Sequence, residues 1–255
     1  MTALHFQTAV LSMAGRRADN QDAYCWRDGL WLVADGLGGH GGGAVAARVA
    51  VETFLQVLPP ECPLESQVLA SGITATAAVL QAYQQSHQAL AGMRTTLALL
   101  MSDGRQALWL HLGDSRVYGF RAGRIMFQTA DHSVAQALVR AGDVAPEAVR
   151  FHEDRHRLLR TLGDQYPPRP TLAEAPLALL PDDAFLLCTD GFWEAVTEAE
   201  MLSTLAEASS TQDWLDRMEG ILRTRQLPDQ DNYTALTVWV SAIDPSTGPT
   251  LSSDR

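Results

Sequence analysis

Residues 95–130 read TTLALLMSDGRQALWLHLGDSRVYGFRAGRIMFQTA, and this stretch decides the fold class. Short apolar runs alternate in it with turn signals at Asp103–Gly104, near Gly113 and at Ala122–Gly123. Each run has the length of a strand, and the intervals between runs are short enough for hairpin turns. The stretch therefore predicts four short strands in an antiparallel meander.

Further strands and helices flank this stretch in blocks. Apolar residues at helical spacing predict two consecutive helices before it, over residues 44–58 and 69–90. Thr197 and Glu200 form a capping box for a later helix, and a further helix covers residues 214–222. The other expected elements are strands at 2–12, 171–180, 184–191 and 231–243, a hairpin at 23–36 turning at Asp28–Gly29, and short helical pieces near 134–140 and 155–162. Because no βαβ alternation occurs, the blocks predict an α+β fold with helices covering antiparallel sheets.

The domain organisation follows from length and composition. A chain of 255 residues is long enough to bury a sizeable core. We expect a single domain over residues 1–243, in which the polar, Arg-rich residues 132–165 form a small flap subdomain. Residues 244–255 are expected to be a disordered tail.

Composition also limits the partners and the compartment. The formal net charge of -11 argues against nucleic acid and against an anionic membrane surface as partners. All 19 basic residues are Arg, which excludes a Walker lysine and Schiff-base chemistry. The three cysteines are widely spaced, and the sequence shows neither a signal peptide nor a long apolar run, so we expect a reduced, cytoplasmic protein.

Four aspartates stand at expected strand ends. Asp35 follows LWLVA, Asp114 follows LWLHLG, Asp190 follows FLLCT, and Asp231 precedes the last strand. A single Asp beside Gly is usually a turn residue. If the four strand ends converge, however, the carboxylates must be balanced by cations or by protonation. Oxygen ligands without a His or Cys cluster favour Mg²⁺ or Mn²⁺ over Zn²⁺.

The glycine-rich stretch VADGLGGHGGG, residues 33–43, has several interpretations. A Walker loop is excluded by the missing lysine, and the GxGxxG spacing of Gly36, Gly38 and Gly41 lacks the βαβ context of a dinucleotide site. A tight turn that exposes a backbone carbonyl beside Asp35 explains the glycines best. Upstream, RRADNQD at 16–22 is either a solvated surface or, beside metals, an arginine fork for phosphate.

Seven short motifs occur in a fixed order along the chain. They are Arg17 with NQD at 20–22, VADGLGGH at 33–40, TTL at 95–97, LGDSRVY at 112–118, DHS at 131–133, CTDG at 188–191 and DNYT at 231–234. This ordered set resembles the PPM family of metal-dependent serine/threonine protein phosphatases, in its compact bacterial form, over roughly residues 7–241. The resemblance implies two stacked antiparallel β-sheets flanked by pairs of α-helices, an αββα sandwich with a small flap subdomain.

The resemblance also implies a binuclear Mn²⁺/Mg²⁺ centre. In it Asp35 would bridge both metals, the Gly36 carbonyl would bind one, and Asp190 and Asp231 would bind the other. Asp114, sharing Asp190, matches the position that holds a third metal in bacterial members. The remaining matched positions are the phosphate-binding Arg17, the supporting acid Asp22, and His40, which either protonates the leaving oxygen or only supports the turn.

The expected reaction is attack of a metal-activated water on phosphorus, without a phosphoenzyme. As a monomer, the protein would remove phosphate from Ser or Thr of protein substrates and counteract a cognate bacterial Ser/Thr kinase. Two alternatives are a catalytically weak or dead phosphoprotein-binding module of the same fold and a small-molecule phosphohydrolase. Two departures from the family pattern are Gln21 in place of Glu, expected to weaken metal binding, and Arg94 in place of Gly, which puts a local turn in doubt. His132 and Ser133 are expected to cap a helix or lie on the surface.

Overall fold

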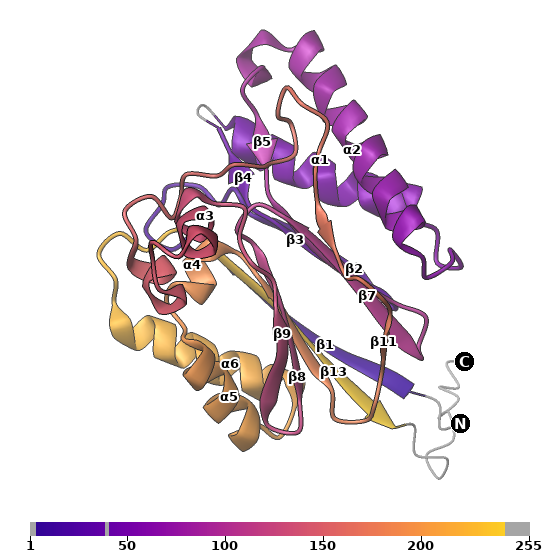
Figure 1. The fold of residues 1–255 in the computed structure, drawn as a ribbon, viewed down its shortest axis with the longest axis vertical. Helices are drawn as coiled ribbons and strands as arrows, with labels where there is room; N and C mark the ends of the chain where they lie inside the picture. Colours follow the sequence, from indigo (N-terminus) through magenta and orange to yellow (C-terminus); the bar gives the residue numbers. More distant parts are fainter. Residues whose placement is uncertain (1–3, 39–40, 243–255) are drawn as a thin grey trace, which may run out of the picture.

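The first and last strands of the fold lie side by side. β1 (Leu4–Met13) pairs antiparallel with β13 (Tyr233–Ala242) over its full length, as the adjacent indigo and yellow ribbons show in Figure 1. This computed structural model describes residues 4–38 and 41–242. His40 and the expected tail at 244–255 lie outside the described residues. The β1–β13 pair brings the two ends of the domain together beside the segment that carries Arg17.

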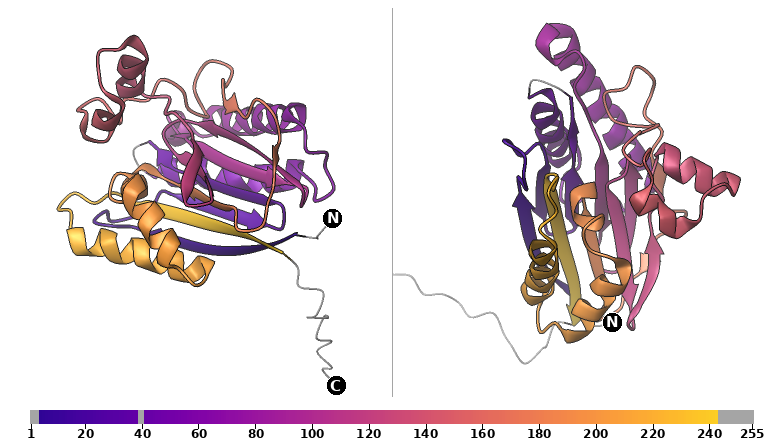
Figure 2. Two further views of the ribbon diagram at one scale, coloured as in Figure 1. Left: turned by 60° about the horizontal axis from the view of Figure 1, so that its bottom comes forward. Right: turned by 90° about the vertical axis from the view of Figure 1, so that its left-hand side faces the viewer.

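Two antiparallel sheets stack on each other (Figure 2). The further strands are β2 (Ala23–Arg27), β3 (Leu30–Ala34), β4 (Gly36–Leu37), β5 (Arg94–Thr95), β6 (Leu97–Ser102), β7 (Gln106–Leu112), β8 (Arg116–Arg121), β9 (Arg124–Gln128), β10 (Thr171–Leu172), β11 (Leu177–Ala178) and β12 (Ala184–Cys188). One sheet has the order β1-β13-β12-β8-β9, the other has the order β10-β7-β6-β3-β2 with β11 also on β7, and β4 pairs with β5.

Pairs of helices cover the outer faces of the two sheets (Figure 2). α1 (Gly42–Val57) and α2 (Ser66–Ser86) pack on the sheet of β3, and α5 (Glu198–Glu207) and α6 (Thr211–Arg225) pack on the sheet of β13. The shorter helices are η1 (Gln88–Leu90), α3 (Val134–Ala141), η2 (Pro146–Phe151) and α4 (Asp190–Trp193). None of the helices in the described residues is both long enough and apolar enough to cross a membrane.

The core has three layers because the inner strands are buried on both faces. In β3, Trp31 and Val33 pack between the sheets, whereas Leu30 and Leu32 pack toward α1. Side chains alternate between the faces of a strand, so a strand covered on both faces must be apolar throughout. This explains the continuous LWLVA run. The one polar atom of the buried Trp31 side chain is satisfied, because its indole N–H donates to Thr8 Oγ1 at 2.9 Å.

The predicted α+β class and the two stacked sheets flanked by helical pairs are confirmed. The single meander is wrong, because β6 and β7 lie in one sheet and β8 and β9 in the other. The chain crosses between sheets at Gly113, whose φ of 98° and close approach to Thr96 fit only glycine. The capping box of Thr197 and Glu200 is confirmed.

The segment between β9 and β12 differs most from the prediction. The helical piece expected near 134–140 is confirmed as α3, whereas the one expected at 155–162 is wrong. A helical turn that was not expected occurs in η2, where Pro146 sets the backbone of the first turn. The strand expected at 171–180 is divided into β10 and β11. Arg94 pairs with Leu37 in the β4–β5 ladder, so the local turn tolerates this side chain.

Ser133 and His132, at the start of the segment predicted to form a flap, have different structural roles. Ser133 caps α3 and accepts a hydrogen bond from the Gln136 backbone N–H, as expected. His132 is neither a cap nor a surface residue, because it is buried and stacks on His111 with ring centroids 4.5 Å apart. Its Nδ1 accepts from the Gly113 N–H, and its Nε2 lies 2.9 Å from Thr171 Oγ1. Burial, with nearby cationic groups, lowers the pKa of His132 to about 3.

We expect His132 to destabilise the fold on acidification. The folded-state pKa lies below the ordinary value of 6.5, so the unfolded chain takes up the proton first. The stabilising contribution is complete above the ordinary value and is lost as the pH falls below it. Linkage sets the loss at about 2 kcal/mol between about pH 7 and about pH 5.

Urea unfolding of the protein and of His132→Gln over this pH range measures the effect. The difference between the two free energies of unfolding should shrink by about 2 kcal/mol on acidification. The difference is the informative quantity, because carboxyls with raised pKa values, such as Asp22, change stability in the opposite direction. A difference that does not depend on pH contradicts the prediction.

Candidate metal centre

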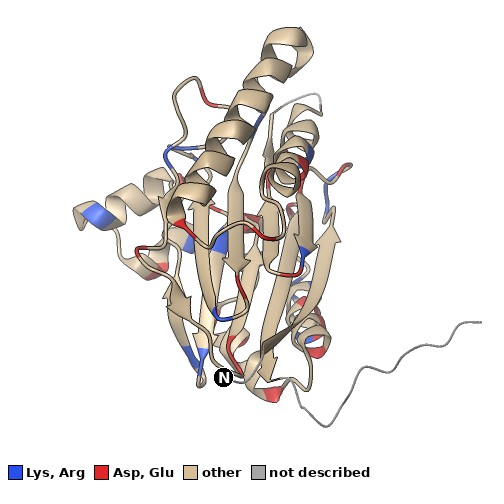
Figure 3. Ribbon diagram, turned by 90° about the vertical axis from the view of Figure 1, so that its right-hand side faces the viewer, with Lys and Arg blue, Asp and Glu red and all other residues tan. Residues whose placement is uncertain are grey.

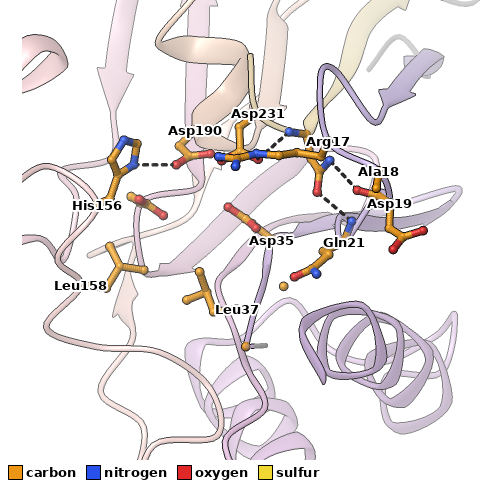
Figure 4. A pocket seen from close by; sticks show the side chains of 14 residues that line it. Arg17, Ala18, Asp19, Gln21, Asp35, Leu37, His156, Leu158, Asp190 and Asp231 are labelled. Atoms are coloured by element: carbon orange, nitrogen blue, oxygen red, sulfur yellow. Dashed lines mark hydrogen bonds and ion pairs between the residues drawn. The ribbon is translucent and has the colours of Figure 1, made fainter. Parts of the chain in front are cut away.

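Four aspartates from four strand ends converge on one cavity of about 620 Å³ (Figure 4). Asp35 follows β3, Asp114 lies at the crossing between β7 and β8, Asp190 opens α4 after β12, and Asp231 precedes β13. The convergence predicted from the strand ends is therefore present. The other lining residues are Arg17, Ala18, Asp19, Gln21, Gly36, Leu37, Gly38, His156, Leu158 and Asn232.

The positive charge near this cavity is too small to balance its carboxyl groups. Burial, with repulsion from Asp190 and other neighbours, raises the pKa of Asp35 and of Asp114 well above the usual range. Burial also raises the pKa of Asp22 to about 7, although hydrogen bonds from Thr234 and Thr189 oppose this shift. A buried carboxylate cluster of this kind is stable when cations balance it.

The donor set fits hard divalent cations. Ligand atoms of Asp114, Asp190 and His156 all lie within 4.8 Å of one another. Asp114 Oδ1 is buried and has no hydrogen-bond partner among the described residues. Carboxylate oxygens with free lone pairs are the ligands that Mg²⁺ and Mn²⁺ prefer, so the residues of this cavity fit such ions.

Two threonines hold Asp35 in place. The Asp35 N–H donates to Thr96 Oγ1 at 2.9 Å, and Thr95 Oγ1 donates to the Asp35 carbonyl at 2.8 Å. The Thr96 N–H donates to the same carbonyl at 2.9 Å. These hydrogen bonds fix the backbone of Asp35 and do not involve its carboxylate. They explain the TTL motif.

Position 36 requires glycine because there is no room for a side chain there, and not because of a special backbone angle. A Cβ at Gly36 would lie 2.2 Å from the Gly43 carbonyl oxygen and 2.6 Å from the Gln21 carbonyl oxygen. A Cβ at Gly43 would lie 2.3 Å from Gln21 Oε1. The glycines therefore let three segments meet under Asp35, whereas the sequence interpretation stressed the turn. The turn conformations lie further along, at Gly38 with φ 141° and at Gly41 with φ 79°.

Arg17 contacts Asp231, and Asp22 contacts the residue before Asp190. The Arg17 guanidinium donates two hydrogen bonds of 2.9 Å to Asp231 (Figure 4) and is half exposed at the rim of the cavity. Asp22 Oδ2 accepts from Thr189 Oγ1 at 2.9 Å, directly before Asp190. Arg17 therefore meets the same carboxylate that the resemblance assigns to a metal.

His156 lines the cavity and is missing from the sequence-based set. Its Nδ1 lies 3.2 Å from Asp190 Oδ2 (Figure 4), and this hydrogen bond is the main cause of its raised pKa. The surrounding residues 152–162 form neither helix nor strand. No periodicity or motif marked His156, so only the fold reveals its position.

Asn232 and Trp193 hold the backbone around the cavity in place through hydrogen bonds. Asn232 accepts from the Gln21 N–H and donates to the carbonyls of Ala14 and Asp19, which fastens the Arg17 segment beside Asp231. The Trp193 indole N–H donates to the Asp114 carbonyl at 2.9 Å. The DNYT motif contained the signal for Asn232, because an Asn next to a candidate ligand can bind several backbone groups.

The sequence model of the family described as Protein phosphatase 2C matches residues 12–232 of this chain. The chain belongs to this family. Membership in the protein phosphatase 2C family confirms the resemblance that the ordered motifs indicated. It also agrees with the stacked sheets and with the acidic cavity at their strand ends.

Individual relatives within the protein phosphatase 2C family are similar over most of this chain. Serine/threonine protein phosphatase PstP of Mycobacterium tuberculosis is 31% identical over 206 residues, which are 78% of this chain and 39% of the relative. This chain thus spans about two fifths of that relative. Protein phosphatase PhpP of Streptococcus pneumoniae is 30% identical over 240 residues, 90% of this chain and 95% of the relative.

A solved structure supports the metal interpretation. The catalytic domain of PstP in complex with two manganese ions superposes with a TM-score of 0.79 at 28% identity, and covers 93% of this chain and 99% of that chain. Family membership and this likeness support metal-dependent catalysis.

Proposed function

We propose that this chain hydrolyses phosphoserine and phosphothreonine in proteins, with a metal-activated water as the nucleophile. The observation that carries the proposal is the convergence of Asp35, Asp114, Asp190 and Asp231 in one cavity whose charge calls for cations. The relatives PstP and PhpP are named as protein phosphatases, which supports protein substrates.

In the proposed centre, Asp35, the Gly36 carbonyl, Asp190 and Asp231 would hold two Mn²⁺ or Mg²⁺ ions, and Asp114 with Asp190 would hold a possible third. Such ions would lower the pKa of a bound water and offset charge on the phosphoryl oxygens. His156 orients Asp190 through the hydrogen bond between them. His40 lies outside the described residues, and its two predicted roles, protonation of the leaving oxygen or support of the turn, both stay predictions.

Arg17 acts on the phosphate in this proposal. Its guanidinium already presents two parallel N–H groups to Asp231, and the same fork fits two oxygens of a phosphate. If Asp231 bound a metal, the Arg17 guanidinium would be released from this carboxylate and could hold the phosphate for attack. Asp22 supports the Asp190 segment, because its Oδ2 accepts a hydrogen bond from Thr189 Oγ1 directly before Asp190.

The organisation around this site is part of the same proposal. We infer a single domain over residues 1–243 with a flap at about 132–165, which acts as a monomer against a cognate Ser/Thr kinase. A cytoplasmic location belongs to the same proposal, and the widely spaced cysteines support it. The flap segment projects from the sandwich, as Figure 2 shows, and its residues His156 and Leu158 line the cavity, so it is placed to contact a substrate protein.

The direct test compares three substrates with the purified chain and Mn²⁺. A phosphothreonine peptide and p-nitrophenyl phosphate should both release phosphate, EDTA should stop both reactions, and glycerol phosphate should react far more slowly. Preference for glycerol phosphate would indicate the small-molecule alternative. Binding of the peptide without any release of phosphate would indicate the regulatory module.

A further inference from the structure

A second groove of about 320 Å³ lies next to the metal cavity. Leu158 lines the metal cavity (Figure 4), and the next residue, Leu159, lines this groove. The two hollows are therefore lined by consecutive residues of one segment. We call it the 159–169 groove, and its lining residues are Leu159, Arg160, Thr161, Asp164, Tyr166, Pro167, Pro168 and Arg169.

The groove is tied to the segment that holds Asp35. Leu162 exchanges two backbone hydrogen bonds with Thr95, of 2.8 and 3.0 Å, and Thr95 in turn binds the Asp35 carbonyl. Arg160 Nη1 donates to the Arg169 carbonyl, which joins the two walls. Pro167 and Pro168 have a fixed φ, so this wall loses little entropy when a ligand binds. The groove is preformed beside the proposed reaction site.

Positive charge collects in this groove although the chain is acidic. The formal net charge is -11, and acidic and basic positions are interspersed over the ribbon in Figure 3. Asp164 lies 3.5 Å from Arg94 outside the groove, which offsets its charge. Among residues 4–38 and 41–242, the ion pairs include neither Arg160 nor Arg169. Two guanidinium groups therefore remain available to an acidic ligand.

The groove also offers apolar surface. Tyr166 and Leu159 are 77% and 56% exposed, which places them among the most exposed large apolar residues described. Both residues line the groove, so an apolar side chain of a ligand can pack against them without displacing any part of the core.

We propose that the 159–169 groove binds the polypeptide that flanks the phosphoresidue and selects acidic and apolar side chains in it. The inference rests on the proposed function, because the phosphoresidue must occupy the metal cavity. An extended chain advances about 3.3 Å per residue, so a few residues beside the phosphothreonine can extend from one hollow into its neighbour. Arg160 and Arg169 bind the acidic side chain, and Tyr166 and Leu159 pack against the apolar one.

The test measures selectivity within each variant. Phosphothreonine peptides carry either Glu and Phe or Arg and Phe at the flanking positions, and the ratio of their kcat/KM values is compared. The wild-type protein should prefer the acidic peptide by about tenfold, through KM. The Arg160→Glu/Arg169→Glu protein should lose or invert this ratio. Arg124→Glu, an exposed charge at the β8–β9 turn, is the control and should keep it.

Three outcomes overturn the inference. The first is a wild-type ratio near one, and the second is an unchanged ratio in the double variant. The third is self-association of the wild-type chain in sedimentation that the double variant lacks, because a second copy would then fill the groove.

A further readout separates this inference from the proposed function. A fluorescein-labelled, unphosphorylated acidic peptide should bind the double variant about tenfold more weakly in anisotropy. That result, in a protein that does not hydrolyse p-nitrophenyl phosphate, would reject the proposed function and still support an acidic-peptide groove. Equal binding would reject the groove, whatever the enzyme does with p-nitrophenyl phosphate.

Discussion

Asp35→Asn will lower kcat/KM for a phosphothreonine peptide by about 10³-fold, equal to about 4 kcal/mol of transition-state stabilisation. The substitution keeps the shape of the side chain and its neighbours, because the hydrogen bonds to Thr95 and Thr96 use only the Asp35 backbone. It removes the charge that is proposed to bridge two ions. The loss should therefore appear in metal affinity and in turnover together.

The same substitution should stabilise the metal-free fold. The Asp35 carboxyl is desolvated and lies among Asp190, Asp22 and other acids, which raises its pKa well above the usual range. At neutral pH its ionisation opposes folding, and a neutral amide avoids that cost. Urea unfolding in EDTA should thus show Asp35→Asn to be more stable than the wild type, although the enzyme is inactive.

Asp216→Asn on the exposed face of α6 is the matched control, because it removes one negative charge far from the cavity. It should leave both turnover and stability close to wild type. A kcat/KM for Asp35→Asn within about tenfold of wild type would contradict the bridging role. A less stable metal-free Asp35→Asn protein would contradict the repulsion argument.

Gly36→Ala is expected to have the second-largest effect. The new Cβ would meet two backbone oxygens, at 2.2 Å from Gly43 and 2.6 Å from Gln21. No rotamer change relieves contacts with backbone, so β4, the Gln21 segment and the start of α1 must separate. A displacement of about 1 Å at a reaction site costs about 10²-fold in rate, and overpacking costs about 1–3 kcal/mol of stability.

Gly92→Ala is the control for this substitution, because a Cβ at Gly92 would have no neighbouring atom within 4 Å. The two variants are compared by kcat/KM for p-nitrophenyl phosphate and by urea unfolding. Gly36→Ala should lose both activity and stability, and Gly92→Ala should retain both. Full activity in Gly36→Ala would show that the close approach under Asp35 is not needed for the reaction.

The strand pattern predicted which residues are buried but not which sheet each strand joins. The apolar runs of residues 95–130 all became strands, yet the chain crosses between sheets at Gly113. A turn between two apolar runs looks the same in sequence whether the strands pair or separate. Only the packing of Trp31 and Phe185 between the sheets decides the outcome.

The site residues that could be predicted are the acidic residues that stand at the ends of predicted strands. Asp35, Asp114, Asp190 and Asp231 each stand at such an end, and the structure brings them together. His156 was not predictable, because it lies in an irregular segment whose path depends on tertiary contacts. The pairing of Arg17 with Asp231 joins residues 214 positions apart, and no local pattern reports such a contact.

The most direct measurement adds Mn²⁺ to EDTA-treated protein, followed by calorimetry and by phosphate release from a phosphothreonine peptide in the same samples. The account predicts saturable binding of at least two ions per chain, with phosphate release rising in parallel, and both weakened in Asp190→Asn. Phosphate release that persists in EDTA, or ion binding that is unchanged in Asp190→Asn, would contradict the account.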